Sequence, residues 1–335
     1  MYRSIRPLLF QMDPEDAHRM TLQLLRLAGR FTPARWLLKS MYSVPDHPVE
    51  AFGLTFRNPI GLAAGYDKDG EAVAGLAALG FGHIEVGTIT PLPQAGNPRP
   101  RIFRLVEDQA VINRMGFPGK GAAFAAQMLK NRERPAAIIL GVNLGKNKDT
   151  PLERSADDYV SLMRTFSPLA DYLAINISSP NTVGLRRLQG RQMLEDLLKA
   201  ISIERGNLKS QTPILVKLAP DLTDDELWDA LDVIMESGMD GIIATNTTLA
   251  RPGLRSEKAD ETGGLSGAPL GTLSMQMLEK IVGRVKGRIP VVSVGGVMTS
   301  ADARQRLEAG AALVQIYTGL VYQGPGLVKK MLKEM

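Results

Sequence analysis

The sequence predicts an α/β protein: a (β/α)8 (TIM) barrel preceded by a helical, membrane-associating extension. Short apolar or β-branched runs alternate with helix-like stretches from residue 59 onward. Eight such runs can be counted, and eight β-then-α units are typical of a closed barrel. A doubly wound open sheet is the alternative, but it rarely needs eight nearly continuous strands. The predicted strands are residues 59–65, 83–90, 136–144, 171–179, 213–219, 241–247, 290–296 and 312–318.

The first 43 residues have a different pattern and are predicted to form the extension, with the barrel over residues 44–335. Asp13 and Pro14 are typical of a helix start, and apolar residues follow at helical spacing. Pro33 lies at the start of a second amphipathic helix. Basic residues occupy the remaining faces, so the pair is either a cap on the barrel or an element on an anionic membrane surface. Periodicity does not separate these two interpretations.

Helices are predicted between the strands because the intervening stretches combine apolar residues at helical spacing with N-terminal caps. In several of them a Thr or Ser cap is followed by acidic residues, which is typical of a helix start. The clearest examples are "ADDYVSLMRTF", "TDDELWDALDVIMESG" and "TSADARQRLEAG".

The composition indicates an ordinary folded protein and excludes several chemistries. Of the 335 residues, 44% are hydrophobic and 22% are charged. The absence of cysteine excludes disulfides, cysteine-ligated iron–sulfur clusters and a thiol nucleophile. His18, His47 and His83 lack metal-ligand spacing, so no metal site is expected. No apolar stretch of ~20 residues and no secretory signal are found, which favours a cytoplasmic body for the chain.

Polar residues gather where the predicted strands end. In a barrel the loops after the strands meet on one face, so these residues predict an active-site rim. The loops over residues 91–117, 180–189 and 248–268 are long enough to wall this rim. The polar residues at the strand ends are Lys68, Thr88, Asn143, Asn176, Ser179, Asn181, Lys217, Thr245, Asn246, Tyr317 and Thr318.

Two features of the rim indicate anionic ligands. Gly295 and Gly296 follow the seventh strand and precede a helix capped by Thr299, a position that favours a phosphate group. Lys217 lies inside an apolar run, where an ammonium group needs an anion or a dipole. Its partner is either a neighbouring carboxylate or a cofactor that gains negative charge on reduction.

Five asparagines at or near the rim indicate the shape of a substrate. Each carboxamide offers a donor and an acceptor, so several together can bracket a planar ligand with alternating N–H and C=O groups. Singly, each is more often a turn residue. With Lys68 available for a carboxylate, the set suggests a small anionic imide. The asparagines are Asn113, Asn143, Asn176, Asn181 and Asn246.

An ordered series of motifs over nearly the whole chain resembles the class 2, quinone-dependent dihydroorotate dehydrogenases of bacterial type. The motifs are "NPIGLAAGYDKDG", "EVGTITPLPQAGNPRPRIFRL", "INRMGFPG", "GVNLGKNKDT", "INISSPNTVGLRRLQ", "VKLAPDL", "IATNTT", "GGLSGAPL", "SVGGV" and "LVQIYTGL". The resemblance implies an FMN flavoprotein that oxidises dihydroorotate to orotate in pyrimidine biosynthesis.

The resemblance also implies site residues. Ser179 matches the catalytic base, and Thr182 and Phe117 match positions that organise a water path for its proton. The implied FMN contacts are Ala64, Gly65, Tyr66, Asp67, Lys68, Thr88, Asn143, Asn176, Lys217, Thr245, Gly267, Gly296, Tyr317 and Thr318. The implied substrate contacts are Lys68, Asn113, Arg114, Met115, Gly116, Phe117, Asn176, Asn181, Asn246 and Thr247.

The soluble class 1 enzymes of this family use cysteine as the base. Serine at the base position and the extra N-terminal helices therefore both resemble class 2 and imply a membrane quinone, ubiquinone or menaquinone, as electron acceptor. The helices would then form a tunnel, with Arg104 and Tyr317 at its inner end and His18 as a further quinone contact or a surface residue. We expect a monomer, peripheral on the cytoplasmic side of the inner membrane, with no nucleic-acid partner. Tyr66 stands where the family motif leads us to expect an aliphatic residue.

Two other function classes remain open from the residues alone. One is a cofactor-free barrel lyase or isomerase that acts on a phosphorylated substrate, because the loops after strands seven and eight would suit its phosphate. The other is a membrane or partner-binding module, which leaves the polar rim unexplained. A bound yellow flavin would distinguish the dehydrogenase from both.

Overall fold

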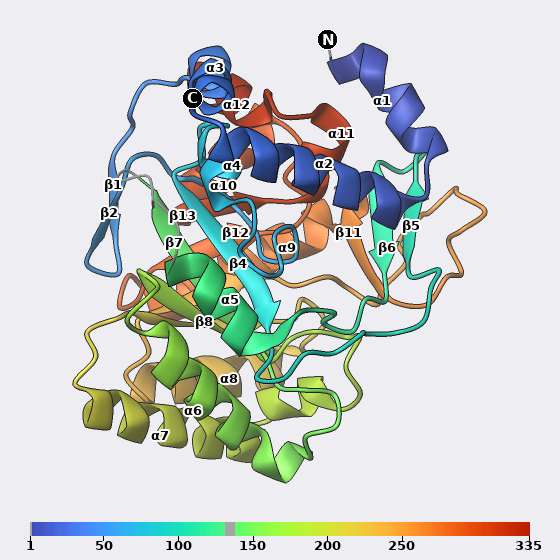
Figure 1. Cartoon of the computed structure of the whole chain (residues 1–335). Coiled ribbons are helices and arrows are strands. Elements are labelled where there is room, and N and C mark those ends of the chain that lie inside the picture. Colours follow the sequence, from blue (N-terminus) through green and yellow to red (C-terminus); the bar gives the residue numbers. More distant parts are fainter. Residues whose placement is uncertain (1, 131–137) are drawn as a thin grey trace.

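A closed parallel barrel forms the centre of the computed structural model, which describes residues 2–130 and 138–335 (Figure 1). Each barrel strand falls inside one of the eight predicted runs, so the barrel is confirmed and the open sheet is wrong. Residues 136 and 137 of the third predicted run lie outside the described residues. In barrel order the strands are β3 (Ile60–Leu62), β4 (His83–Ile89), β7 (Ile139–Leu144), β8 (Tyr172–Asn176), β9 (Ile214–Leu218), β10 (Gly241–Ala244), β12 (Val291–Val294) and β13 (Leu313–Ile316).

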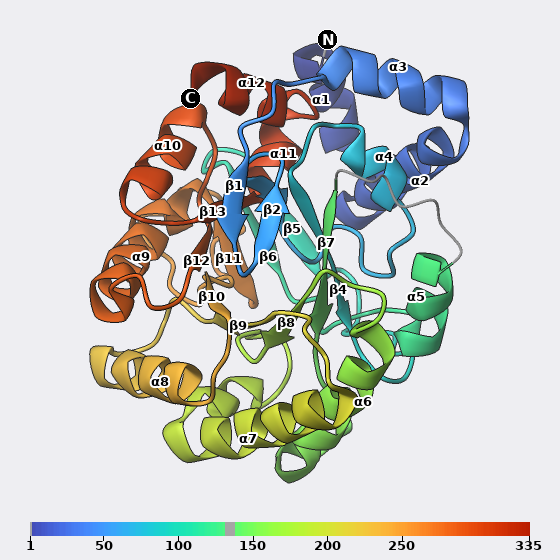
Figure 2. The same ribbon diagram turned by 90° about the vertical axis from the view of Figure 1, so that its left-hand side faces the viewer.

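Helices between the strands form a ring around the barrel (Figure 2). Two of the predicted starts have full capping boxes, in which Thr223 pairs with Glu226 and Thr299 pairs with Asp302. The helices are α4 (Val73–Ala77), α5 (Gly121–Lys130), α6 (Ser155–Phe166), α7 (Arg191–Leu208), α8 (Asp224–Glu236), α9 (Gly271–Val285), α10 (Ser300–Glu308), α11 (Thr318–Gln323) and α12 (Leu327–Glu334). Short 3-10 turns are η1 (Leu152–Arg154), η2 (Leu185–Gln189) and η3 (Ala268–Leu270).

The amino-terminal end of the barrel is closed by a hairpin of β1 (Val49–Ala51) and β2 (Leu54–Phe56), which crosses that end in Figure 2. Phe56 is fully buried there and its ring meets that of His83 at a centroid distance of 5.4 Å. Burial lowers the pKa of His83 to about 4, so its imidazole is neutral at physiological pH. This end is therefore a packed core, and a site must lie at the opposite, carboxyl end of the strands.

Three N-terminal helices lie beside the barrel: α1 (Tyr2–Gln11), α2 (Pro14–Arg30) and α3 (Thr32–Tyr42). The predicted start at Asp13 is confirmed, because its carboxylate accepts hydrogen bonds from the N–H groups of Glu15 and Asp16. α1 was not predicted. α2 packs closely on α4, where a Cβ on Gly75 would lie 2.0 Å from the carbonyl oxygen of Leu25. No helix within the described residues is long and apolar enough to cross a membrane.

A small antiparallel sheet stands above the barrel rim, in segments predicted as loops. It consists of β5 (Ile102–Leu105), β6 (Ala110–Asn113) and β11 (Gly264–Gly267), in the order β11-β6-β5. The prediction of loops over 91–117 and 248–268 is therefore wrong for these three strands. β11 pairs with β6 across about 150 residues of chain, so Gly264 lies opposite Asn113. This sheet brings Asn113 and Gly267 to the rim from distant parts of the sequence.

Candidate active site

A cavity of about 460 Å³ lies at the carboxyl end of the barrel and continues between the barrel and helices α1 and α2. Its size falls within the ~300–1,000 Å³ typical of ligand pockets. On the helix side it is lined by residues that include Tyr2, Phe10, Ala17, His18, Thr21 and Leu25. On the barrel side it brings together most of the predicted site residues: Ala64, Gly65, Tyr66, Lys68, Thr88, Asn113, Met115, Gly116, Phe117, Asn176, Ser179, Asn181, Lys217, Thr245, Asn246, Thr247, Gly267, Gly296, Tyr317 and Thr318.

A chain of side-chain hydrogen bonds fixes three of the asparagines at the cavity floor. The Asn176 amide donates to Thr88 Oγ1 at 3.0 Å and to Asn143 Oδ1 at 3.1 Å. Asn246 donates to Asn176 Oδ1 at 3.3 Å and to Ser178 Oγ at 3.0 Å. Because each amide is held by its neighbours, the orientation of Asn176 and Asn246 toward a ligand is set before the ligand binds.

Glu85 lies at the centre of the barrel interior beneath this floor and is fully buried. Its carboxylate accepts from Asn143 Nδ2 and Gln315 Nε2, both at 2.8 Å, and from the Tyr172 hydroxyl at 3.1 Å. The Lys217 ammonium lies 3.5 Å from the same carboxylate. Burial opposes ionisation, but Lys217 and the three hydrogen bonds outweigh it and hold the pKa of Glu85 below its usual range.

Lys217 therefore has the carboxylate partner that the sequence left open, and it also lines the cavity. The ion pair with Glu85 stabilises the buried ammonium without any other anion. At 3.5 Å the contact is long for a charge-assisted hydrogen bond. The ammonium thus keeps donor capacity for a second acceptor on the cavity side.

Ser179 lies in the loop after β8, is 5% exposed and lines the cavity. Its hydroxyl oxygen accepts one long hydrogen bond, 3.3 Å, from the Asn181 N–H. The Asn181 amide donates in turn to Asn113 Oδ1 at 3.1 Å. The Thr182 hydroxyl is buried and has no hydrogen-bond partner in the described part of the chain. A buried hydroxyl of this kind needs a water or ligand partner.

Glycines with positive φ shape the far side of the cavity as a main-chain cradle. Gly267, Gly295 and Gly296 have φ of 98°, 111° and 72°, and all three line the cavity. A Cβ on Gly296 would lie 2.3 Å from the Cα of Gly271. Within residues 2–130 and 138–335, the N–H groups of Gly296 and Val297 donate no hydrogen bond to the chain. Such a cradle of free N–H groups fits an anionic group, and its place after β12 is the phosphate position predicted from the sequence.

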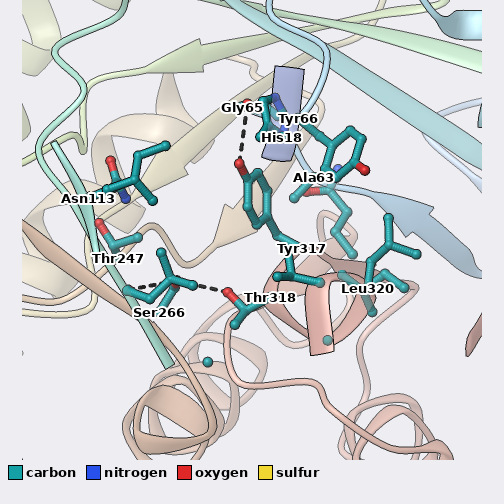
Figure 3. Close-up of a pocket in the computed structure, with 18 of the residues that line it drawn as sticks. His18, Ala63, Gly65, Tyr66, Asn113, Thr247, Ser266, Tyr317, Thr318 and Leu320 are labelled. Atoms are coloured by element: carbon teal, nitrogen blue, oxygen red, sulfur yellow. Dashed lines mark hydrogen bonds between the residues drawn. The ribbon is translucent and has the colours of Figure 1, made fainter. Parts of the chain in front are cut away.

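Aromatic rings form the junction between the two parts of the cavity (Figure 3). The Tyr66 ring meets that of His18 at 4.8 Å and that of Tyr317 at 5.8 Å. The Tyr317 hydroxyl donates to the carbonyl of Gly65 at 3.5 Å, and Lys68 donates to the same carbonyl at 2.9 Å. Burial lowers the pKa of His18 to about 3 and that of Lys68 to about 8.

The family model for dihydroorotate dehydrogenase matches residues 48–335. The chain belongs to the dihydroorotate dehydrogenase family. A protein from Roseiflexus sp. named dihydroorotate dehydrogenase (quinone) is 50% identical over 98% of this chain and 91% of its own length. A protein of the same name from Pectobacterium atrosepticum is 47% identical over 99% of this chain and 98% of its own length. The crystal structure of a DHODH from Eimeria tenella in complex with ferulenol superposes with a TM-score of 0.89, at 39% identity, covering 98% of this chain and 93% of that one.

Three predicted contact residues do not line the cavity. Asn143 lies just beneath it, between Thr88 and Glu85. The Asp67 carboxylate accepts from two main-chain N–H groups, those of Glu71 and Ala72. The Arg114 guanidinium turns away to Glu261 at 2.6 Å and lies over a phenylalanine ring. Side-chain contact with a ligand therefore requires rearrangement of Asp67 or Arg114, and their binding roles stay predictions.

Glu85 is one residue of the site that sequence reasoning missed. It is a carboxylate inside the apolar run "HIEVGTI", and a charge in a buried strand is as informative there as it is at Lys217. Glu85 on β4 and Lys217 on β9 both point into the barrel interior, and their carboxylate and ammonium groups pair there.

Proposed function

We propose that this protein oxidises dihydroorotate to orotate with FMN as the hydride acceptor and a membrane quinone as the final electron acceptor. The observation that carries the proposal is one continuous cavity, which joins a polar end of fixed asparagines to an apolar end between the barrel and helices α1 and α2. An enzyme that takes electrons from a polar substrate and passes them to an apolar one needs a polar and an apolar binding region close together. The family relationship supports the same reaction.

The residues at the rim fit FMN. The cradle of Gly267, Gly295 and Gly296 suits its phosphate, and the floor of Thr88 and Asn176 suits the edge of a flat ring. FMN, when bound, supplies a two-electron acceptor that takes a hydride and passes electrons on. The further proposed FMN residues are Ala64, Gly65, Tyr66, Asp67, Lys68, Asn143, Lys217, Thr245, Tyr317 and Thr318.

The polar end suits dihydroorotate. The carboxamides of Asn113, Asn181 and Asn246 offer alternating donors and acceptors for the ring edge, and Lys68 offers a cation for the carboxylate. These groups supply orientation, which is a large part of rate enhancement in a reaction between two held partners. The remaining proposed substrate contacts are Arg114, Met115, Gly116, Phe117, Asn176 and Thr247.

We assign proton abstraction from C5 of dihydroorotate to Ser179. A serine hydroxyl is a weak base, so its own proton must leave as the substrate proton arrives. We propose that the Thr182 hydroxyl, three residues further along the same loop, holds the water that takes this proton; the absence of a hydrogen-bond partner for it among the described residues supports this role. Phe117, the other residue of the proposed water path, lines the cavity.

Lys217 supplies electrostatic stabilisation. Its ammonium pairs with Glu85 in a buried site, so it needs little reorganisation when negative charge develops on the cavity side. Glu85 stays ionised because its pKa is held down, and it therefore keeps a positive partner in place. The ion pair with Glu85 therefore holds the Lys217 ammonium at the cavity.

We infer that residues 1–43 form the membrane-facing extension and bind quinone. Nine large hydrophobic side chains within the described residues of this segment are exposed, and Trp36 is 69% exposed. A basic excess in the same segment suits anionic headgroups. The proposed location is the cytoplasmic face of the inner membrane. The exposed side chains are Ile5, Leu8, Met12, Leu24, Leu27, Phe31, Trp36, Leu37 and Met41.

The inner end of the proposed quinone site lies at His18, Arg104 and Tyr317. The Arg104 guanidinium donates to the carbonyl of Leu9 at 2.9 Å and also to that of Met12, so it holds the end of α1 against the barrel. Neutral His18 offers a hydrogen bond to a quinone oxygen without placing a second cation beside Arg104.

The proposal is tested on the purified full chain. We expect a yellow protein that releases FMN on denaturation and forms orotate from dihydroorotate only when a quinone is present. A colourless protein that regains no activity with added FMN would contradict it, and would favour the cofactor-free lyase.

A further inference from the structure

Arg306 on α10 is a buried cation, 3% exposed, that the proposed reaction does not use. Its guanidinium donates to the carbonyls of Gly271 at 3.0 Å and Gly295 at 2.9 Å. It also donates to the hydroxyls of Ser274 at 2.9 Å and Ser293 at 3.1 Å. All four acceptors are neutral.

A buried guanidinium normally pairs with a carboxylate. Among the described residues, no carboxylate oxygen lies within ion-pair distance of Arg306. The nearby Asp302 carboxylate instead accepts from the N–H groups of Met298 and Thr299. Burial lowers the pKa of Arg306 to about 10, which leaves it charged at neutral pH. The site therefore contains a positive charge that an anion close by would stabilise.

The carbonyl of Gly295 links this charge to the cavity. It accepts from Ser274 at 2.8 Å as well as from Arg306, so it is held toward α9 and α10. In a trans peptide the C=O and the following N–H point in opposite directions. The N–H of Gly296 is thereby aimed away from Arg306, and Gly296 lines the cavity.

We propose that Arg306 is a positioning residue for the phosphate group of the flavin. It fixes the Gly295–Gly296 peptide so that the N–H faces the phosphate, and it supplies the buried counter-charge behind the cradle. The inference rests on the proposed function, because that function places a phosphate there.

The test compares FMN with riboflavin, which has the same ring system but no phosphate. Apoprotein of the full chain is titrated with each flavin, and quenching of flavin fluorescence gives the two dissociation constants. The variants are Arg306→Gln, which removes the charge but keeps a donor, and Arg306→Lys, which keeps the charge. Arg304→Gln is the matched control, because Arg304 is exposed on the same helix and donates to the carbonyl of Glu334.

The measured quantity is the preference for FMN, the ratio of the riboflavin to the FMN dissociation constant. We expect Arg306→Gln to lower this preference by about 10- to 100-fold, as loss of a buried opposite charge implies. Arg306→Lys should lower it by about threefold, because one ammonium cannot reach four acceptors. Arg304→Gln should leave it unchanged.

An unchanged preference in Arg306→Gln, including equal losses for both flavins, would overturn the inference and make Arg306 a purely structural residue. If that variant does not fold, an unchanged preference in Arg306→Lys has the same meaning. Failure of the wild-type apoprotein to bind either flavin would instead refute FMN as the cofactor.

Discussion

Replacement of Ser179 by alanine should slow the proposed proton transfer while changing the stability of the protein little. The hydroxyl accepts a single hydrogen bond of 3.3 Å, so its loss should lower the free energy of unfolding by less than about 1 kcal/mol. The side chains of Asn181 and Asn246, which are proposed to hold the substrate, are held by Asn113, Asn176 and Ser178 and not by the Ser179 hydroxyl, so orotate affinity should change little. Reduction of the flavin by dihydroorotate should slow by about 100- to 10,000-fold, the usual contribution of a general base.

The neighbouring Ser178 provides the matched control. Its hydroxyl is fully buried, donates to Asn176 Oδ1 at 3.0 Å and accepts from Asn246 at 3.0 Å. Ser178→Ala should therefore lower the free energy of unfolding by about 1–3 kcal/mol, more than Ser179→Ala. It should slow flavin reduction less than Ser179→Ala does, by about tenfold or less, because only positioning is disturbed.

Anaerobic stopped-flow measurement of flavin reduction, with orotate titration and thermal unfolding of each variant, gives all three quantities. A Ser179→Ala enzyme reduced at the wild-type rate would refute Ser179 as the base. Equal slowing in both serine variants would mean that the loop conformation, and not the Ser179 hydroxyl, limits the reaction.

Three further predictions follow from the structure. Deletion of residues 1–40 should slow reoxidation by quinone more than reduction by dihydroorotate; equal losses in the two half-reactions would make the segment only structural. Orotate affinity should fall above pH 8, by up to about tenfold per pH unit, because the pKa of Lys68 in the folded protein is about 8 and the orotate carboxylate needs the charged form of Lys68. The Lys68→Gln variant should bind orotate weakly and without this pH dependence. A wild-type orotate affinity that stays constant to pH 9 would contradict the role of Lys68. Gly61→Ala should lower the melting temperature, because a Cβ at this position would lie 2.0 Å from the His83 ring and overpacking typically destabilises a protein by about 1–3 kcal/mol. Gly206→Ala is the control: a Cβ at Gly206 would have nothing within 4 Å, so this variant should lose no stability.

The barrel strands could be predicted because each is a short apolar run between caps and turns. α1 was missed because Pro7 lies inside it, and a proline usually interrupts a helix. Its position depends on contacts more than 300 residues away, such as that of the Tyr2 hydroxyl with the carbonyl of Val321. The β5–β6–β11 sheet was missed for a related reason, because the pairing of β11 with β6 is set by the closed barrel and not by local sequence.

Part of the candidate site was predicted from polar residues at strand ends, and the rest from the resemblance to the dihydroorotate dehydrogenase family. What the sequence could not give is which side chains are already engaged. Asn176, Asn143 and Thr88 form one hydrogen-bonded unit, and Arg114 points to Glu261 instead of the cavity. Arg306 was missed because a basic residue in an amphipathic helix usually faces solvent, and only the packing of α9 on β12 encloses it.

Two anaerobic half-reactions on one sample test the central claim, that a single cavity takes electrons from dihydroorotate at its polar end and releases them to quinone at its apolar end. Dihydroorotate is added first, and the reduced protein is then mixed in parallel with ubiquinone, menaquinone, fumarate or NAD. We predict that dihydroorotate bleaches the bound flavin and that only a quinone restores its colour rapidly. A flavin that dihydroorotate does not bleach, or that fumarate or NAD reoxidises as fast as the quinones do, would contradict the claim.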